Sequence, residues 1–314
     1  MVIKKRNNNY IIGLATGLLI AFFIFKVLPA LQVKLSSNQI SIPFLTNIPT
    51  VTPDPAKLQE EITKEVLPQK VNLGISFNDS IVKMIEVGAI DKEKFLALYQ
   101  DRGRLKSEES KLLDTPSNKE IILTPDNAGL LLNLLWPLGI ANKTNVLSEG
   151  PMGTQYKDTV GNFASTGGWS LGTIDGGQLF NKYEIVKLNP TQEALVTEIS
   201  QNIYRPCCGN STYFPDCNHG AAMLGFIELA VNQGMPKEKI YQKALALNSL
   251  WFPQTYAELG VYFRMKKGTP WTQVDPQEVL GQNYSSGSGY IAISKQLQSE
   301  GLLPQVEGGG GCGV

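Results

Sequence analysis

A compact group of cysteine and histidine residues is the feature of this chain best suited to chemistry. Three of the four cysteines and the only histidine lie within thirteen consecutive residues, which read Cys-Cys-Gly-Asn-Ser-Thr-Tyr-Phe-Pro-Asp-Cys-Asn-His. Thiolates and imidazole are protein ligands that suit Zn, Cu(I) and iron–sulfur centres. We therefore predict a four-coordinate site for Zn or Cu(I). The ligands that it would use are Cys207, Cys208, Cys217 and His219.

The spacing of these cysteines differs from that of a standard zinc finger. Cys207 and Cys208 are adjacent, and two neighbouring residues do not easily ligate one ion in an unstrained tetrahedron. The remaining cysteine, Cys312, lies in the glycine-rich C-terminal tail 304–314. Because glycine gives that tail conformational freedom, we expect that Cys312 can reach the site and replace one of the adjacent pair.

The local sequence places the cluster in a loop between two helices. Arg205-Pro206 ends the first helix, because the residue before a proline is disfavoured in helical conformation. An apolar repeat from Ala222 onward predicts the second. Cys217 and His219 then lie near the positive N-terminal end of the second helix, which lowers the pKa of a thiol. We further expect the carboxylate of Asp216 to support His219 as a hydrogen-bond partner.

Two other uses of the same cysteines remain open. In an oxidising compartment they can form structural disulfides, and four cysteines allow three different pairings. The chain would then be a non-enzymatic interaction domain recognised by another protein outside the cytoplasm. The cysteines can also act as redox-active thiols, because thiol–disulfide exchange needs a reactive thiolate and a second thiol. We favour metal binding or delivery, and a binding protein over an enzyme.

The N-terminus predicts a membrane anchor. Lys4-Lys5-Arg6 lies in the basic end 1–9, and the predominantly apolar segment 10–31 follows. About 20 apolar residues span a bilayer, and the poor cleavage site after this segment argues against its removal as a signal peptide. Basic residues ahead of a span favour a cytoplasmic N-terminus. We therefore predict a single-pass signal anchor at 10–31, with the C-terminal domain outside the cytoplasm.

Beyond the anchor, the chain predicts a stalk and a mostly α-helical domain. Residues 32–54 are rich in proline and threonine, which suits an extended spacer. Residues 55–303 repeatedly combine a capping residue or proline with an apolar stripe at helical spacing. Residues 150–177 are instead rich in glycine, serine and threonine, and predict loops or short strands. Helices are expected at about 55–67, 79–88, 91–99, 124–136, 189–203, 222–234, 236–247, 254–265, 276–281 and 289–300.

One stretch resembles a known family. Residues 193–253 combine a helix ending in Arg205-Pro206-Cys207-Cys208, a second helix, the segment Gly234-Met235-Pro236-Lys237-Glu238-Lys239-Ile240-Tyr241 and a third helix. This pattern is similar to the three-helix domain of CcmH-type cytochrome c maturation proteins, which are membrane-anchored thiol reductants outside the cytoplasm. It covers about a fifth of the chain.

The resemblance to the CcmH-type proteins implies a redox function for the cluster. It would place Cys207 or Cys208 at the first active cysteine and would require Cys217 to resolve the mixed disulfide. The family's cysteine pair is Cys-x-x-Cys, whereas Cys207 and Cys208 are adjacent here and Cys217 lies nine residues beyond Cys208. The dithiol exchange of the family therefore does not transfer directly to this sequence.

Composition argues against two other classes of function. Lys plus Arg and Asp plus Glu both total 28, so no net positive field attracts a nucleic acid, and we predict none as a partner. Ser285-Ser286-Gly287-Ser288-Gly289 lacks the Gly-x-Ser-x-Gly order of a nucleophile elbow. His219 is the only histidine and belongs to the cluster, which disfavours a serine hydrolase.

Overall fold

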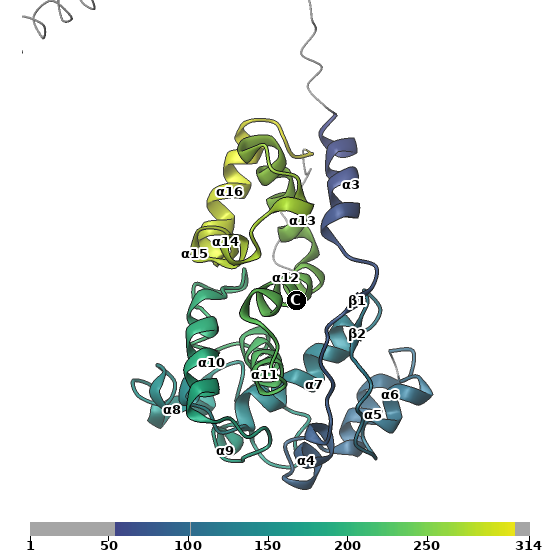
Figure 1. Ribbon diagram of the computed structural model, residues 1–314, viewed down its shortest axis with the longest axis vertical. Coiled ribbons are helices and arrows are strands. Elements are labelled where there is room, and N and C mark those ends of the chain that lie inside the picture. The colour runs from purple at the N-terminus through teal and green to yellow at the C-terminus, as the bar shows by residue number, and fades with distance from the viewer. Residues whose placement is uncertain (1–53, 101, 305–314) are drawn as a thin grey trace, which may run out of the picture. The chain divides into compact units, whose positions relative to one another are not determined.

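The computed structural model describes residues 54–100 and 102–304, which belong to the unit of the chain that begins at Pro53. These residues form helices joined by loops, with one two-stranded sheet among them (Figure 1), which confirms the prediction of a mostly helical domain. The first helices are α3 (Pro55–Val66), α4 (Ser80–Glu86), α5 (Lys92–Gln100), α6 (Ser107–Lys111), α7 (Ala128–Ala141), α8 (Asn145–Glu149) and α9 (Gly176–Leu179). The later helices are α10 (Pro190–Asn202), α11 (Asn218–Asn232), α12 (Lys237–Trp251), α13 (Pro253–Tyr262), α14 (Pro276–Leu280), α15 (Gln282–Ser285) and α16 (Gly287–Ser299). Short 3-10 or π turns are η2 (Lys157–Asn162), η3 (Phe263–Lys267) and η4 (Trp271–Gln273).

Local capping explains where several helices begin. Asn189 and Gln192 form a reciprocal capping box at the start of α10, as their spacing predicts. Helix α7 begins later than predicted, after Asn127 rather than at Thr124. The Asn127 side chain accepts a hydrogen bond from the Thr124 amide at 2.8 Å and donates one to the Ile122 carbonyl at 2.7 Å. These bonds hold residues 125–127 in a turn before the helix starts.

The short strands lie outside the segment in which we expected them. Strands β1 (Val71–Asn72) and β2 (Ile122–Leu123) pair antiparallel. The described residues 150–177 instead form turns, η2 and the first residues of α9. Their backbone hydrogen bonds are local, such as that from the Gly167 amide to the Phe163 carbonyl at 2.8 Å. The prediction of loops for 150–177 is therefore confirmed, and the alternative of strands there is wrong.

Helices α7 and α11 pack closely together at the centre of the core (Figure 1). As its composition predicts, α7 is buried on nearly all sides. A Cβ atom at Gly139 of α7 would lie 1.8 Å from the carbonyl oxygen of Ala221 in α11, so only glycine permits this crossing. The contact holds the first turn of α11 in place, and Cys217 is the N-cap of that helix.

Helix α11 also carries a buried carboxyl group. Glu228 is 0% exposed, and its Oε2 accepts a hydrogen bond from the Asn142 side chain at 3.2 Å. Its Oε1 has no hydrogen-bond partner among the described residues. Burial, and secondarily the charge of Glu193, raises the pKa of Glu228 well above its usual value, although the bond from Asn142 lowers it. The folded protein therefore favours the neutral form of this group.

Replacing Glu228 with glutamine is expected to stabilise the protein at neutral pH. A carboxyl group whose pKa is raised in the folded state destabilises the protein as the pH increases. The loss begins near the pKa of the group in the unfolded chain, about 4.3, and grows until the pH reaches its pKa in the folded protein. Each unit of pKa difference corresponds to about 1.4 kcal/mol, and the neutral amide removes this loss. Thermal unfolding between pH 4 and pH 8 should show the variant gaining on the wild type as pH rises. Glu61→Gln, at an exposed position of α3, is the control. Parallel pH curves for Glu228→Gln and wild type would contradict the assignment.

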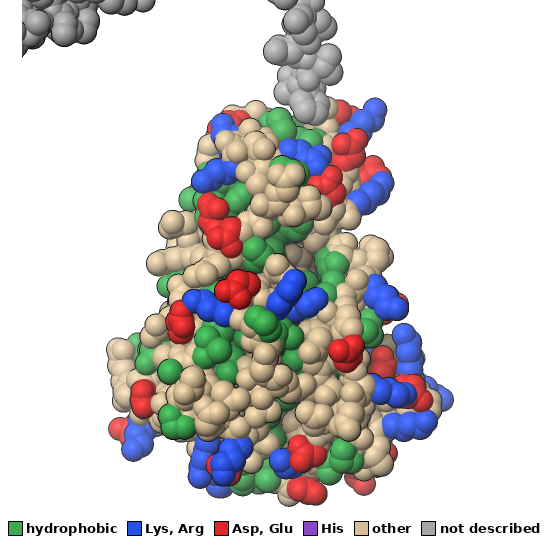
Figure 2. Space-filling model, viewed as in Figure 1, with side chains coloured by type: hydrophobic (Ala, Val, Ile, Leu, Met, Phe, Trp, Pro, Cys, Tyr) green, Lys and Arg blue, Asp and Glu red, His purple; other side chains and the backbone are tan. Residues whose placement is uncertain are grey.

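Several predicted segments lie outside the described residues. These are the basic end 1–9, the anchor 10–31, the stalk up to residue 53 and the tail beyond Pro304. Within the part of the chain that is described, no helix is both long and apolar enough to cross a bilayer. Basic and acidic side chains are intermingled over the face seen in Figure 2. The expectation that nucleic acid is not a partner stays a prediction.

Candidate metal centre

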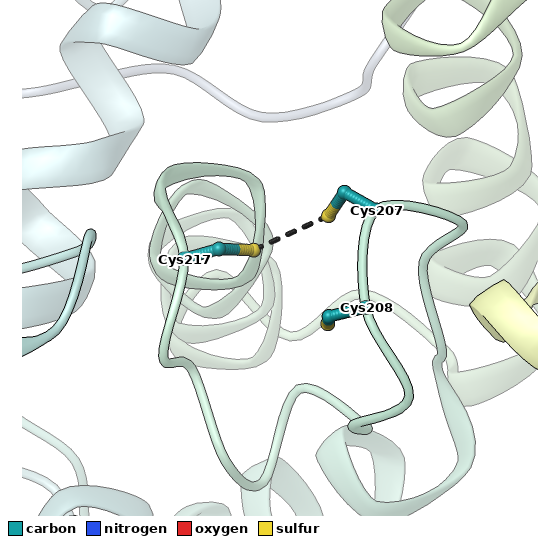
Figure 3. Close-up of side chains that lie close together, drawn as sticks. All are labelled: Cys207, Cys208 and Cys217. Atoms are coloured by element: carbon teal, nitrogen blue, oxygen red, sulfur yellow. Dashed lines mark hydrogen bonds between the residues drawn. The ribbon is translucent and has the colours of Figure 1, made fainter. Parts of the chain in front are cut away.

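Three cysteine sulfurs converge at the loop between α10 and α11. The Sγ atoms of Cys207, Cys208 and Cys217 all lie within 4.8 Å of one another, and those of Cys207 and Cys217 are 3.4 Å apart (Figure 3). A tetrahedral Zn site with Zn–S bonds of about 2.3 Å has sulfurs about 3.8 Å apart. The 3.4 Å separation is close to that value and the other two separations do not exceed 4.8 Å, so the three sulfurs lie near enough to one another to bind one metal ion.

The adjacent cysteines both contribute to this cluster. The side chains of Cys207 and Cys208 project from the loop on the side where Cys217 lies (Figure 3). The backbone carbonyl of Cys208 accepts a hydrogen bond of 2.7 Å from the Gly287 amide at the start of α16. Adjacency, which the sequence suggested would exclude one of the two, therefore does not prevent both sulfurs from facing Cys217.

Backbone hydrogen bonds close the base of the cysteine loop. The amide and the hydroxyl of Thr212 both donate to the carbonyl of Ile203, at 2.8 and 3.0 Å. Tyr204 forms an antiparallel bridge with Ser211, and its amide donates to the Leu280 carbonyl at 2.8 Å. The loop is therefore fixed on α14 at one end and on α11 at the other.

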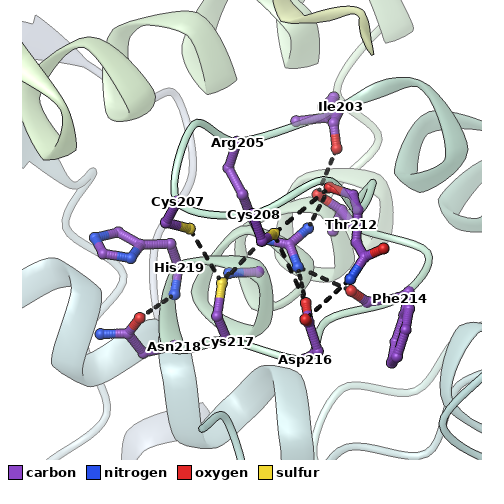
Figure 4. A network of polar contacts seen from close by, with 12 residues as sticks. Ile203, Arg205, Cys207, Cys208, Thr212, Phe214, Asp216, Cys217, Asn218 and His219 are labelled. Atoms are coloured by element: carbon purple, nitrogen blue, oxygen red, sulfur yellow. Dashed lines mark hydrogen bonds and ion pairs between the residues drawn. The ribbon is translucent and has the colours of Figure 1, made fainter. Parts of the chain in front are cut away.

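Arg205 is the organising residue of the loop, although its side chain is only 1% exposed. Its Nε donates to the Cys217 sulfur at 3.1 Å, and its Nη2 pairs with Asp216 at 2.6 Å (Figure 4). Its remaining hydrogen bonds go to the carbonyls of Asn210 at 3.1 Å and Phe214 at 2.8 Å. One guanidinium thus ties the loop backbone to a sulfur. The sequence indicated Arg205 only as the end of a helix.

Asp216 has a different partner from the one that we predicted. We expected its carboxylate to support His219, but it binds the guanidinium of Arg205 and accepts a hydrogen bond of 2.9 Å from the Asn210 side chain. The physical reason is charge: a buried guanidinium requires a carboxylate close by. Asp216 therefore neutralises Arg205, and the prediction of a bond to His219 is wrong.

The start of α11 is shaped around the Arg205 side chain. A Cβ atom at Gly220 would lie 2.5 Å from the guanidinium carbon of Arg205, so a larger residue would displace it. The Gly220 amide donates to the sulfur of Cys217 at 3.4 Å, as expected for the N-cap of a helix. The predicted position of Cys217 at a helix N-terminus is confirmed.

Hydrogen bonds polarise the three thiols. Bonds from Cys207 and Cys208, together with the positive charge of Arg205, lower the pKa of Cys217 against the effect of burial. Hydrogen bonds with Cys208 and Cys217, followed by burial, raise the pKa of Cys207. The bond with Cys207 lowers the pKa of Cys208, but the bond with Cys217 and burial together outweigh this effect. The pKa of Cys208 is therefore raised, to about 11. Cys217 is thus the cysteine of the cluster whose ionisation is favoured, whereas Cys207 and Cys208 lose their protons less readily.

His219 lies beside the cluster without joining the three converging sulfurs. Its ring packs on Phe252 and Trp251, with centroids 4.4 and 5.9 Å apart, and points away from the Arg205 guanidinium (Figure 4). Its side chain also lowers the pKa of Cys217, and its buried Nδ1 has no hydrogen-bond partner among the described residues. The role of His219 as a ligand stays a prediction, as does that of Cys312, which lies outside the described residues.

Comparisons with known proteins do not assign the chain to a family. Helices α10, α11 and α12 follow one another as the resemblance to the CcmH-type domain implies. Neither protein-family models, nor curated proteins, nor solved structures give a significant match to this sequence. The function of the centre must therefore be argued from its own geometry.

Proposed function

We propose that this protein binds a soft metal ion, Zn or Cu(I), through Cys207, Cys208 and Cys217. The observation that carries the proposal is the convergence of three sulfurs within 4.8 Å of one another. Thiolates are the ligands that select these ions over Mg²⁺ or Ca²⁺. Binding requires the loss of the thiol protons, so metal affinity should increase with pH.

The surroundings of the sulfurs also suit a bound ion. Zn(II) with three thiolates carries one net negative charge, and the buried guanidinium of Arg205 lies 3.1 Å from one of the sulfurs. The hydrogen bond from the Gly220 amide in the first turn of α11 also orients the Cys217 sulfur. Such contacts behind the ligands fix their direction and strengthen metal binding.

The exposure of the site favours exchange of the ion over a purely structural role. Cys207 is exposed, and Cys208 and Cys217 are partly exposed. A ligand that is accessible to solvent can be replaced by a ligand of an acceptor molecule, which allows the bound ion to be transferred. We therefore assign metal binding and delivery to this centre.

The proposal also includes the location of the centre, in a domain that residues 10–31 anchor to the membrane and that lies outside the cytoplasm. A reporter that is active only outside the cytoplasm, fused after Val314, tests that location.

A thiol–disulfide reductant is the second candidate. The observation that favours it is the 3.4 Å separation of the Cys207 and Cys217 sulfurs, together with the lowered pKa of Cys217. A reactive thiolate next to an exposed thiol is the arrangement that disulfide exchange requires. The two candidates differ in one respect that can be measured directly, since a reductant needs no bound metal.

We assign the fourth ligand position to His219. Its buried Nδ1 lacks a hydrogen-bond partner among the described residues, and its side chain lies near enough to Cys217 to lower the pKa of that thiol. Cys312 is the competing ligand. Helix α16 starts beside Cys208 and its 13 residues extend about 20 Å. The chain from Pro304 to Cys312 spans up to about 28 Å, so the tail is long enough to return.

The His219→Phe variant of the reduced full-length chain is expected to bind Zn or Cu(I) at least about 10-fold more weakly than wild type, because it keeps the aromatic packing but removes the nitrogen ligand. Competition titration with a chromophoric chelator measures this affinity. Cys312→Ser is the matched variant, and its affinity should stay within about twofold of wild type. A loss of affinity in Cys312→Ser but not in His219→Phe would contradict the assignment. If reduced wild-type protein binds neither ion, the proposed function fails.

A further inference from the structure

Among the described cysteines, Cys207 and Cys217 are well placed to form a disulfide. Their sulfurs are 3.4 Å apart and already share a hydrogen bond, whereas a disulfide bond is about 2.05 Å long. Cys207 is exposed and Cys217 is held from behind by the Gly220 amide and the Arg205 Nε. Closing the gap therefore requires movement chiefly of the exposed Cys207 side chain.

The other two pairings are less favourable. Adjacent residues joined by a trans peptide have Cα atoms about 3.8 Å apart, whereas a disulfide spans at least about 4.4 Å, which disfavours a bond between Cys207 and Cys208. The thiol of Cys208 faces the Asp216 carboxylate at 3.8 Å and the Asn210 carbonyl at 3.9 Å. Its backbone is held by Gly287. The Cys208 thiol thus has oxygen acceptors beside it as well as the other sulfurs, and the bond to Gly287 restrains its movement towards Cys217.

We infer that oxidation joins Cys207 to Cys217 and thereby closes the metal site, leaving Cys208 as the remaining thiol of the cluster. The ion would lose two of its three sulfur ligands, and the two ligands that remain, Cys208 and His219, would hold Zn or Cu(I) much more weakly than four. The loss of metal rests on the proposed function. The pairing of the cysteines does not.

The oxidant is a small disulfide such as oxidised glutathione. The exposed Cys207 passes its proton to the Cys217 thiolate through the hydrogen bond between them, and the Cys207 thiolate then attacks one sulfur of the oxidant. A mixed disulfide forms, and the first glutathione leaves as a thiolate that takes this proton back from Cys217. The Cys217 thiolate then attacks the Cys207 sulfur, which forms the intramolecular bond and releases the second glutathione as a thiolate that takes a proton from water. Two electrons pass from the two cysteines to the oxidant, which becomes two glutathione thiols.

The test uses the full-length chain with Cys312→Ser, so that only the three clustered cysteines remain. The metal-free protein is treated with oxidised glutathione, alkylated and mapped by mass spectrometry. We expect a Cys207–Cys217 linkage and an alkylated Cys208. Adding Cys208→Ser should leave this linkage intact, whereas adding Cys207→Ser should abolish it. Oxidation should weaken Zn or Cu(I) binding at least about 100-fold, and reduction should restore it.

Three results would overturn the inference. They are a linkage between Cys208 and Cys217, three thiols that stay reduced in excess oxidant, or an oxidised protein that retains the affinity of the reduced one. If the reduced chain binds no metal, the proposed function fails, and the mapped linkage still decides the pairing. Since Cys207 is exposed, its replacement tests the pairing even if replacement of a more buried cysteine prevents folding.

Discussion

Replacing Arg205 with methionine is expected to lower the free energy of unfolding by about 3–5 kcal/mol, the usual loss when one partner of a buried ion pair is removed. Methionine fills a similar volume but donates no hydrogen bond. The Asp216 carboxylate would lose its cation, and the carbonyls of Asn210 and Phe214 would lose their donor. The Cys217 sulfur would also lose a hydrogen bond, so metal affinity should fall as well.

Denaturant unfolding of the metal-free protein measures the effect on stability. Arg264→Met is the matched control, because Arg264 is paired with Glu65 and both side chains are about a third exposed. A surface pair of this kind contributes about 0–1 kcal/mol. Equal losses in the two variants would show that Arg205 is not the organising residue of the loop.

The Cys217→Ser variant is expected to bind Zn or Cu(I) at least about 100-fold more weakly than wild type, which corresponds to about 2.7 kcal/mol. Serine is a preferred N-cap residue, so it can accept the hydrogen bond from the Gly220 amide and preserve the start of α11. A hydroxyl is nevertheless a poor ligand for a soft ion. The substitution therefore separates the metal-binding role of Cys217 from its capping role.

Competition titration against a chelator gives the affinity, and circular dichroism checks that the helices are retained. Asn189→Ser makes the equivalent replacement at the N-cap of α10, away from the sulfurs, and should leave metal affinity unchanged. If Cys217→Ser binds the ion as tightly as wild type, Cys217 is not a ligand and the proposed centre is incorrect.

Features that depend on neighbouring residues could be predicted from the sequence. The capping box of Asn189 and Gln192 sets the start of α10, and the all-apolar run in α7 predicts a buried helix, because both effects act within a few residues. The position of Cys217 at the start of α11 could be inferred in the same way. The sequence also predicts that Cys207, Cys208 and Cys217 cluster, but it does not predict how their sulfurs are arranged.

Features that depend on the closed loop could not be predicted. Because Arg205 precedes a proline, the sequence alone indicates only that a helix ends at this residue. Its role arises only when the loop folds back and brings Phe214 and Asp216 to the guanidinium. The partner of Asp216 was predicted wrongly for the same reason, since the sequence gives no sign that a buried positive charge lies nearby. Gly220 leaves room for that charge, but this role becomes evident only in the folded loop.

The most direct test of the central claim is X-ray absorption spectroscopy at the metal edge, combined with elemental analysis. The reduced full-length chain is loaded with Zn or Cu(I) and freed of excess ion. We predict one ion per chain with three sulfur neighbours, at about 2.3 Å for Zn. A chain that retains no ion, or an ion surrounded only by nitrogen and oxygen, would contradict the assignment of Cys207, Cys208 and Cys217 as a metal centre.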